Sequence, residues 1–130
     1  MPWPSMSLAL GRFTLHEVRD GFFALDGGAM FGVVPKPLWE RRQPPDERNR
    51  IQLSARCLLI EDGKRKVLVD DGIGQVWDGK HREMYGIDHS RYDLDRELAR
   101  VGCRHDDVTD VVLTHLHFYH AGGTTRMQGG

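Results

Sequence analysis

The sequence predicts an α/β protein in which a mixed sheet carries a flanking helix. Three observations support this fold class: apolar, β-branched runs of strand length, one segment with the apolar spacing of a helix, and a histidine-rich segment placed directly after the last apolar run. The chain of 130 residues is long enough for one domain with a core of its own.

The N-terminal third is expected to contain two paired strands and a long loop. Residues 13–18 alternate apolar and polar side chains, which predicts a half-buried strand. Asp20-Gly21 is a turn signal, so residues 22–25 are expected to pair back as a second strand. Residues 26–50 are rich in glycine and proline and predict a long surface excursion.

A hairpin follows in the middle of the chain. Residues 51–60 read as a strand, residues 61–64 as the turn, and residues 66–70 as the return strand. The continuous apolar run of the return strand indicates burial on both faces, as in a sheet covered by helices. Residues 75–88 are polar and read as a loop.

One helix is predicted between this hairpin and the last strand. Residues 90–93 resemble a capping box. Leu94, Leu98 and Val101 follow at helical spacing and form one apolar stripe. Gly102 is a suitable residue to end the helix, and residues 111–113 then predict a short buried strand.

Three histidines, His115, His117 and His120, stand at the C-terminal end of that strand. Neutral imidazole is the side chain that most often binds metals, and zinc favours nitrogen donors. In extended backbone His115 and His117 share one face and can hold the same ion. His120 follows a turn, so it either completes that site or belongs to a second, adjacent one.

Residues 114–123, THLHFYHAGG, resemble the HxHxDH motif of the metallo-β-lactamase-fold hydrolases. The strand before the Asp70-Asp71-Gly72 turn resembles that superfamily's strand ending in Asp-x-Gly, and the glycine-rich loop at residues 27–32 looks like that of its lactonase-like branch. The resemblance implies the first half of an αββα sandwich, with residues 1–130 forming a single truncated metallo-β-lactamase-like domain.

The resemblance also implies a zinc-dependent hydrolase of small ester or lactone-type substrates. His115 and His117 would bind the first metal ion and His120 a second, while Asp70 would brace the metal loop without touching the metal. One or two zinc ions would supply metal-bound hydroxide and polarise the substrate carbonyl.

Tyr119 stands where the superfamily has an aspartate ligand. A phenol has a pKa near 10 and is neutral at pH 7 unless a metal or a cation activates it, and it is bulkier than a carboxylate. We therefore expect a weakened or empty second site and at most one zinc ion. Ligation by a Tyr119 phenolate is the alternative, and it would suit iron in an oxidoreductase relative; zinc, iron and manganese all stay open.

The chain also differs from the superfamily in length. Members of the superfamily are usually much longer and take further metal ligands from their second half. The chain alone is therefore expected to be an impaired hydrolase. The alternative is a non-catalytic fragment or pseudoenzyme that binds metal weakly or not at all. A sheet without its partner leaves an apolar face exposed, which predicts self-association.

The remaining properties exclude several classes of function. A net charge of −1 offers no case for binding nucleic acid or a membrane surface. The N-terminal residues lack the features of a signal peptide, and two distant cysteines, Cys57 and Cys103, read as reduced thiols, so a cytoplasmic location is expected. The other histidines are expected at the surface (His16, His81, His89 and His105), and two tryptophans in core packing rather than in a pocket (Trp39 and Trp77).

Overall fold

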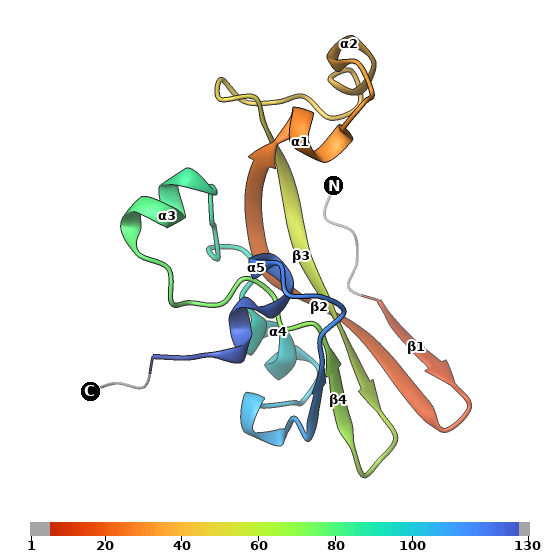
Figure 1. Ribbon diagram of the computed structural model, residues 1–130. Coiled ribbons are helices and arrows are strands. Elements are labelled where there is room, and N and C mark those ends of the chain that lie inside the picture. The colour runs from red at the N-terminus through yellow and green to blue at the C-terminus, as the bar shows by residue number, and fades with distance from the viewer. Residues whose placement is uncertain (1–5, 128–130) are drawn as a thin grey trace.

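The computed structural model describes residues 6–127, which form one mixed five-stranded sheet with short helices around it (Figure 1). The strands lie in chain order: β1 (Ser7–Leu10), β2 (Phe13–Asp26), β3 (Arg50–Glu61), β4 (Lys66–Val69) and β5 (Asp110–Val112). Neighbours are antiparallel except β4 and β5, which are parallel. The predicted α/β class with a mixed sheet is confirmed.

The helices are all short. They are α1 (Gly27–Phe31), α2 (Lys36–Trp39), α3 (Gly79–Met84), α4 (Leu94–Arg100) and α5 (Phe118–Ala121), with single 3₁₀ turns at His105–Asp107 and Gly122–Thr124. Residues 26–50 and 75–88 were both expected as loops, and they contain α1, α2 and α3. None of the helices described is long and apolar enough to cross a membrane.

The long strand β2 differs from the prediction of two strands joined at Asp20-Gly21. It runs through that dipeptide and pairs with β3 on both sides of a register shift between Arg19 and Phe22. The extra residues are absorbed in a bulge, where Gly21 takes a positive φ of 94°. The turn signal therefore marks a bend of a continuous strand, and the expected hairpin partner of residues 13–16 is β1 instead.

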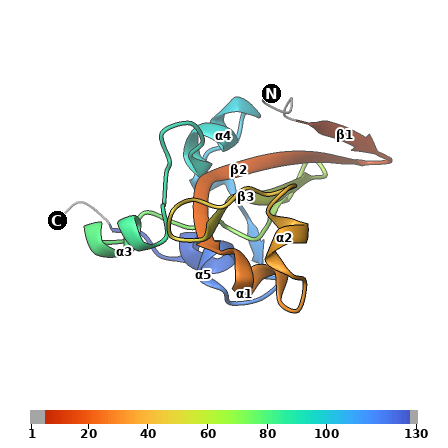
Figure 2. The ribbon, with the colours of Figure 1, turned by 90° about the horizontal axis from the view of Figure 1, so that it is seen from above.

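The helix α4 begins later than predicted. Its N-cap is Asp93 rather than Ser90, since the Asp93 carboxylate accepts a hydrogen bond from the Arg96 backbone N–H at 3.1 Å. Gly102 follows the helix with a φ of 74°, as expected of a residue that ends it. Figure 2 shows α4 lying along one side of β2.

The core consists of two clusters of buried side chains. One joins the stripe of α4 to the sheet (Val18, Cys57, Leu59, Leu68, Leu94, Leu98 and Cys103), and the other gathers aromatic residues around Phe23, Ala55, Ile73 and Ile87. Both cysteines are free and buried, in agreement with reduced thiols.

Helices cover β4 on one face only, so the prediction of burial on both faces is wrong. Leu68 is 4% exposed, but its neighbours Val67 and Val69 are half-buried. The expected burial of β5 is also wrong, because Val111 and Val112 are each 49% exposed. An apolar run predicts a strand, but not whether a second layer covers it.

Two histidines expected at the surface are buried. His16 lies between the Ser7 hydroxyl at 2.7 Å and the Glu61 carboxylate at 2.9 Å, and His89 packs beside Asp20. Cross-strand polar partners make the burial of His16 tolerable, which strand alternation alone does not reveal. Trp39 is 4% exposed and stacks on Phe31, as the core-packing prediction requires.

Candidate metal centre

The three histidines lie together at the C-terminal end of β5. The ring centroids of His115 and His117 are 4.7 Å apart, and those of His115 and His120 are 4.0 Å apart. His117 stands at the start of α5, whose single turn carries His120 back toward the other two rings. The backbone thus groups three imidazoles that the sequence spreads over six positions.

Asp70, the residue after β4, connects the histidine segment to the sheet. Its carboxylate lies 2.7 Å from His120 Nδ1 and accepts hydrogen bonds from the backbone N–H and the hydroxyl of Thr114. The backbone of Asp70 has a φ of 60°, which is uncommon for a residue other than glycine. These bonds hold the carboxylate against Thr114 and His120.

The same carboxylate fixes the tautomers of two rings. The single proton of the Thr114 hydroxyl goes to Asp70, so the hydroxyl oxygen accepts a hydrogen bond from His115 Nδ1–H, 2.9 Å away. His120 Nδ1 donates to Asp70 directly. Both rings then carry their proton on Nδ1, which leaves each Nε2 with a lone pair for a metal ion.

The surroundings of the site shift the pKa values of His115 and Asp70. Some desolvation, together with the charges of His120 and His117, lowers the pKa of His115. Burial raises the pKa of Asp70, but its hydrogen bonds with Thr114 and His120 outweigh this and bring that pKa below the ordinary value. The lowered pKa of Asp70 favours its ionised carboxylate, and the lowered pKa of His115 favours the neutral ring that can bind a metal ion.

Tyr119 packs as part of an aromatic cluster. Its ring stacks on Phe23 at a centroid distance of 4.7 Å and lies 5.5 Å from the ring of His117. Its hydroxyl is 3.4 Å from His117 Nδ1. The side chain therefore stands among the histidines while its ring is anchored on the sheet.

The donor chemistry fits a zinc ion, but the donors described do not complete a site. Imidazole nitrogens with Nδ1 held by a carboxylate are typical zinc ligands. Within residues 6–127, however, no three histidine, cysteine, aspartate or glutamate side chains are arranged to hold one ion together. The three histidines are therefore candidate ligands and not an arranged site.

Two further aspartates, which the sequence analysis did not single out, hold the loop that follows β4. Asp71 accepts hydrogen bonds from the Gly123 backbone N–H at 3.0 Å and the Thr124 hydroxyl at 2.6 Å. Asp20 accepts from the backbone N–H groups of Ile73 and Gly74, both at 2.8 Å, and of Leu94 at 3.0 Å. Burial chiefly raises the pKa of Asp71, and the nearby charges of Asp20 and Asp70 add to the increase.

The glycine pair after the histidines packs directly against that loop. A Cβ on Gly122 would collide with the carbonyl oxygen of Ile73, and a Cβ on Gly123 with that of Asp71. Only glycine therefore allows the backbone of this pair to approach the loop after β4 so closely.

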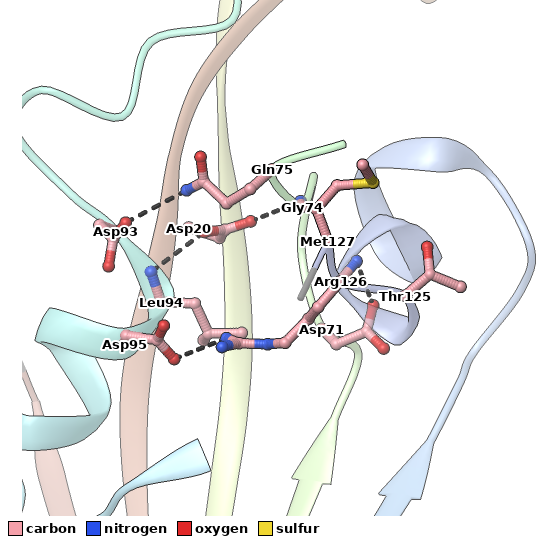
Figure 3. Close-up of a pocket in the computed structure, with 11 residues that line it drawn as sticks. Asp20, Asp71, Gly74, Gln75, Asp93, Leu94, Asp95, Thr125, Arg126 and Met127 are labelled. Carbon is pink, nitrogen blue, oxygen red and sulfur yellow. Dashed lines mark hydrogen bonds and ion pairs between the residues drawn. The ribbon is translucent and has the colours of Figure 1, made fainter. Parts of the chain in front are cut away.

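A cavity of about 180 Å³ lies between this loop, the start of α4 and residues 123–127 (Figure 3). Asp20, Asp71, Asp93 and Asp95 line it together with Arg126, whose guanidinium donates to Asp95 at 2.7 Å. None of the three histidines lines this cavity. It is therefore not the substrate pocket of the candidate centre.

Three known proteins are similar to this chain, two in structure and one in sequence. A probable metal-dependent hydrolase from Staphylococcus aureus is 36% identical, with a TM-score of 0.82 over 91% of this chain and 43% of its own. AidC, a dizinc quorum-quenching lactonase, is 23% identical, with a TM-score of 0.66 over 92% of this chain and 38% of its own. The metallo-hydrolase mfmC of Annulohypoxylon moriforme is 24% identical over 96% of this chain and 34% of that protein.

The chain thus spans less than half the length of each of these relatives. Residues 50–128 match the family model of the metallo-beta-lactamase superfamily. This match includes β3, β4, β5 and the histidine segment. The chain belongs to the metallo-beta-lactamase superfamily.

Proposed function

We propose that this chain carries the histidine-bearing part of a zinc-dependent hydrolase site for small ester or lactone-type substrates. The observation that carries the proposal is the position of Asp70, which binds His120 directly and His115 through Thr114. The presence of lactonases among the structural relatives supports the substrate class.

In this proposal His115, His117 and His120 would hold the metal, together with ligands from outside the cluster. A zinc ion bound there would polarise a carbonyl group and lower the pKa of a water molecule to about 7. Asp70 keeps the His115 and His120 rings in the ligating tautomer, and its own negative charge strengthens their donor nitrogens. Tyr119 takes up the aspartate position, so at most one ion is expected.

The proposal is tested by hydrolysis of an N-acyl homoserine lactone and a simple aryl ester by the purified chain with added zinc. Activity that a chelator abolishes, and that His120→Ala lowers at least about tenfold while His81→Ala leaves unchanged, is the expected result. His81 is a matched control because it lies on α3, away from the cluster. Hydrolysis that is insensitive to both chelator and His120→Ala contradicts the proposal.

A second candidate is a pseudoenzyme that binds metal weakly without catalysis. Two observations favour it: Tyr119 stands at the aspartate position, and no three donors among the residues described form a site. Zinc binding that depends on His120, with no hydrolysis of either substrate, would establish this second candidate and exclude the first.

A further inference from the structure

Ser7 on β1, His16 on β2 and Glu61 on β3 form a chain of hydrogen bonds outside the candidate metal centre. Ser7 Oγ lies 2.7 Å from His16 Nδ1, and His16 Nε2 lies 2.9 Å from a carboxylate oxygen of Glu61. β1 and β5 are opposite edges of the described sheet, as Figure 1 shows, so these residues are separate from the histidine cluster. A hydroxyl, an imidazole within hydrogen-bond distance and a third group that orients the imidazole are the parts of an activated nucleophile.

The strand register explains why these side chains meet. Ser7 is paired directly with His16, and Glu61 lies diagonally opposite His16 on β3. The Glu17 backbone N–H donates to the Met6 carbonyl at 3.0 Å, so this pair is a hydrogen-bonded one. The next pair, Ser7 and His16, is therefore non-hydrogen-bonded, and the side chains of such pairs lie closer together.

The charges fix the direction in which the protons are shared. The Glu61 carboxylate forms an ion pair with Lys66 at 2.9 Å, which favours its ionised form. An ionised carboxylate only accepts hydrogen bonds, so the proton between Glu61 and His16 belongs to His16 Nε2. In the neutral ring Nδ1 then carries the lone pair, and the Ser7 hydroxyl donates to it. His16 is thus placed as a base for the Ser7 hydroxyl.

Ser7 can be reached by a reagent, while its base is shielded. Ser7 is exposed, whereas His16 is only 9% exposed. Because β1 is an edge strand and Ser7 belongs to a non-hydrogen-bonded pair, its backbone N–H points away from β2, toward the edge of the sheet. An N–H group in this position can donate to the oxyanion that forms when a carbonyl compound reacts with Oγ.

We propose that Ser7 is a nucleophile that takes the acyl group of activated carboxylic esters, such as aryl esters, without a metal ion. Ser7 Oγ attacks the ester carbonyl carbon, and the hydroxyl proton passes to His16 Nδ1. The new Oγ–C bond replaces the bond to the aryl oxygen, and the leaving phenolate takes the proton from His16. One N–H donor stabilises the oxyanion only in part, so the ester needs a good leaving group. The acyl group on Ser7 is a poorer acyl donor than the aryl ester and therefore accumulates.

Acylation is measured with p-nitrophenyl acetate and the purified chain in the presence of a chelator. We expect a burst of about one equivalent of nitrophenol per chain, with the acetyl group located on Ser7 by peptide mass spectrometry. Ser7→Ala should abolish the burst, and His16→Ala should slow it at least about a hundredfold. Ser90→Ala is the matched control and should retain the burst, because Ser90 is also exposed but bonds to Asp88 instead of a histidine.

Three outcomes overturn the proposal. An acetyl group found only on lysines or on the N-terminal amine assigns the reaction to exposed amines. Equal bursts from Ser7→Ala and Ser90→Ala show that Ser7 is not acylated. A His16→Ala variant that circular dichroism shows to be folded, and that reacts as fast as wild type, excludes His16 as the base. Continuous, chelator-sensitive hydrolysis belongs to the proposed zinc site, so the burst and the zinc-dependent activity succeed or fail independently.

Discussion

At the scale of single residues, Asp70 determines which nitrogen atoms His115 and His120 offer. Its carboxylate accepts from His120 Nδ1 and from the Thr114 hydroxyl, and the pKa of Asp70 stays low because of these bonds. A metal-binding cluster needs rings with a defined tautomer, and for His115 and His120 this condition follows from one carboxylate.

Replacement of Tyr119 by aspartate should raise the metal content. Tyr119→Asp restores an anionic ligand beside His120, so the content is expected to rise from at most one ion per chain toward two. The same change removes the stacking of Tyr119 on Phe23, which is worth about 0.5–1.5 kcal/mol, so the melting temperature should fall.

Elemental mass spectrometry after dialysis against zinc measures this content. Tyr119→Phe is the control, because it keeps the ring on Phe23 and removes only the hydroxyl, and it should leave the content unchanged. If Tyr119→Asp binds no more metal than wild type, this position does not limit the second ion.

Gly122 is required by the close approach of two loops. Gly122→Ala places a methyl group against the carbonyl oxygen of Ile73, where only backbone movement can relieve the collision. We expect a loss of at least about 2 kcal/mol in the free energy of unfolding. Gly79→Ala, whose Cβ meets nothing within 4 Å, should change it by less than about 1 kcal/mol. Urea denaturation compares the two, and equal stabilities would show that the loops do not pack as described.

At the scale of elements, a polar ladder ties four strands together. Ser7 on β1 contacts His16 on β2, His16 contacts Glu61 on β3, and Glu61 forms an ion pair with Lys66 on β4 at 2.9 Å. Burial raises the pKa of Glu61, but the bonds with Lys66 and His16 lower this pKa by a larger amount, so the net shift is downward.

This downward shift gives the ladder a defined pH dependence. A carboxyl group whose pKa is lowered by folding stabilises the fold fully above its unfolded pKa of about 4.3, and this stabilisation disappears as the pH falls through the folded pKa. Glu61→Gln should therefore lower the melting temperature near neutral pH, with a difference from wild type that shrinks below about pH 4. Thermal melts across this range test it, with the exposed Glu47→Gln as control, and a constant difference at every pH would refute the role of Glu61.

Local patterns predicted some elements well. The strands β3, β4 and β5 and the helix α4 follow from apolar runs and from the spacing of Leu94 and Leu98. The course of β2 was not predictable, because the Asp20 side chain bonds to backbone N–H groups of Ile73 and Leu94, far along the chain. Such tertiary bonds turn a local turn signal into a bulge.

The candidate site was predictable only in part, because local sequence patterns do not reveal tertiary hydrogen bonds. The histidine spacing located the cluster, and the resemblance pointed to Asp70. The roles of Asp20 and Asp71 as loop anchors depend on backbone groups that come close only in the folded chain. The metal-binding role of the three histidines stays a prediction.

At the scale of the whole molecule, both the covering of the sheet and the set of metal ligands are incomplete among the residues described. The sheet buries one face against α4, while Val67 and Val69 on its other face stay half-buried. The histidine cluster lacks an arrangement of three ligands among residues 6–127. The relatives carry additional polypeptide of more than half their own length. Full activity is therefore expected to need groups that this chain does not bring together alone.

The central claim is that His115, His117 and His120 form a metal centre supported by Asp70. Metal content per chain, measured by elemental mass spectrometry after dialysis against excess zinc, tests it most directly. The account predicts about one zinc ion per wild-type chain, and a near-complete loss in a variant with His115→Ala and His120→Ala. A zinc content of the wild-type chain no higher than that of the double variant would contradict it.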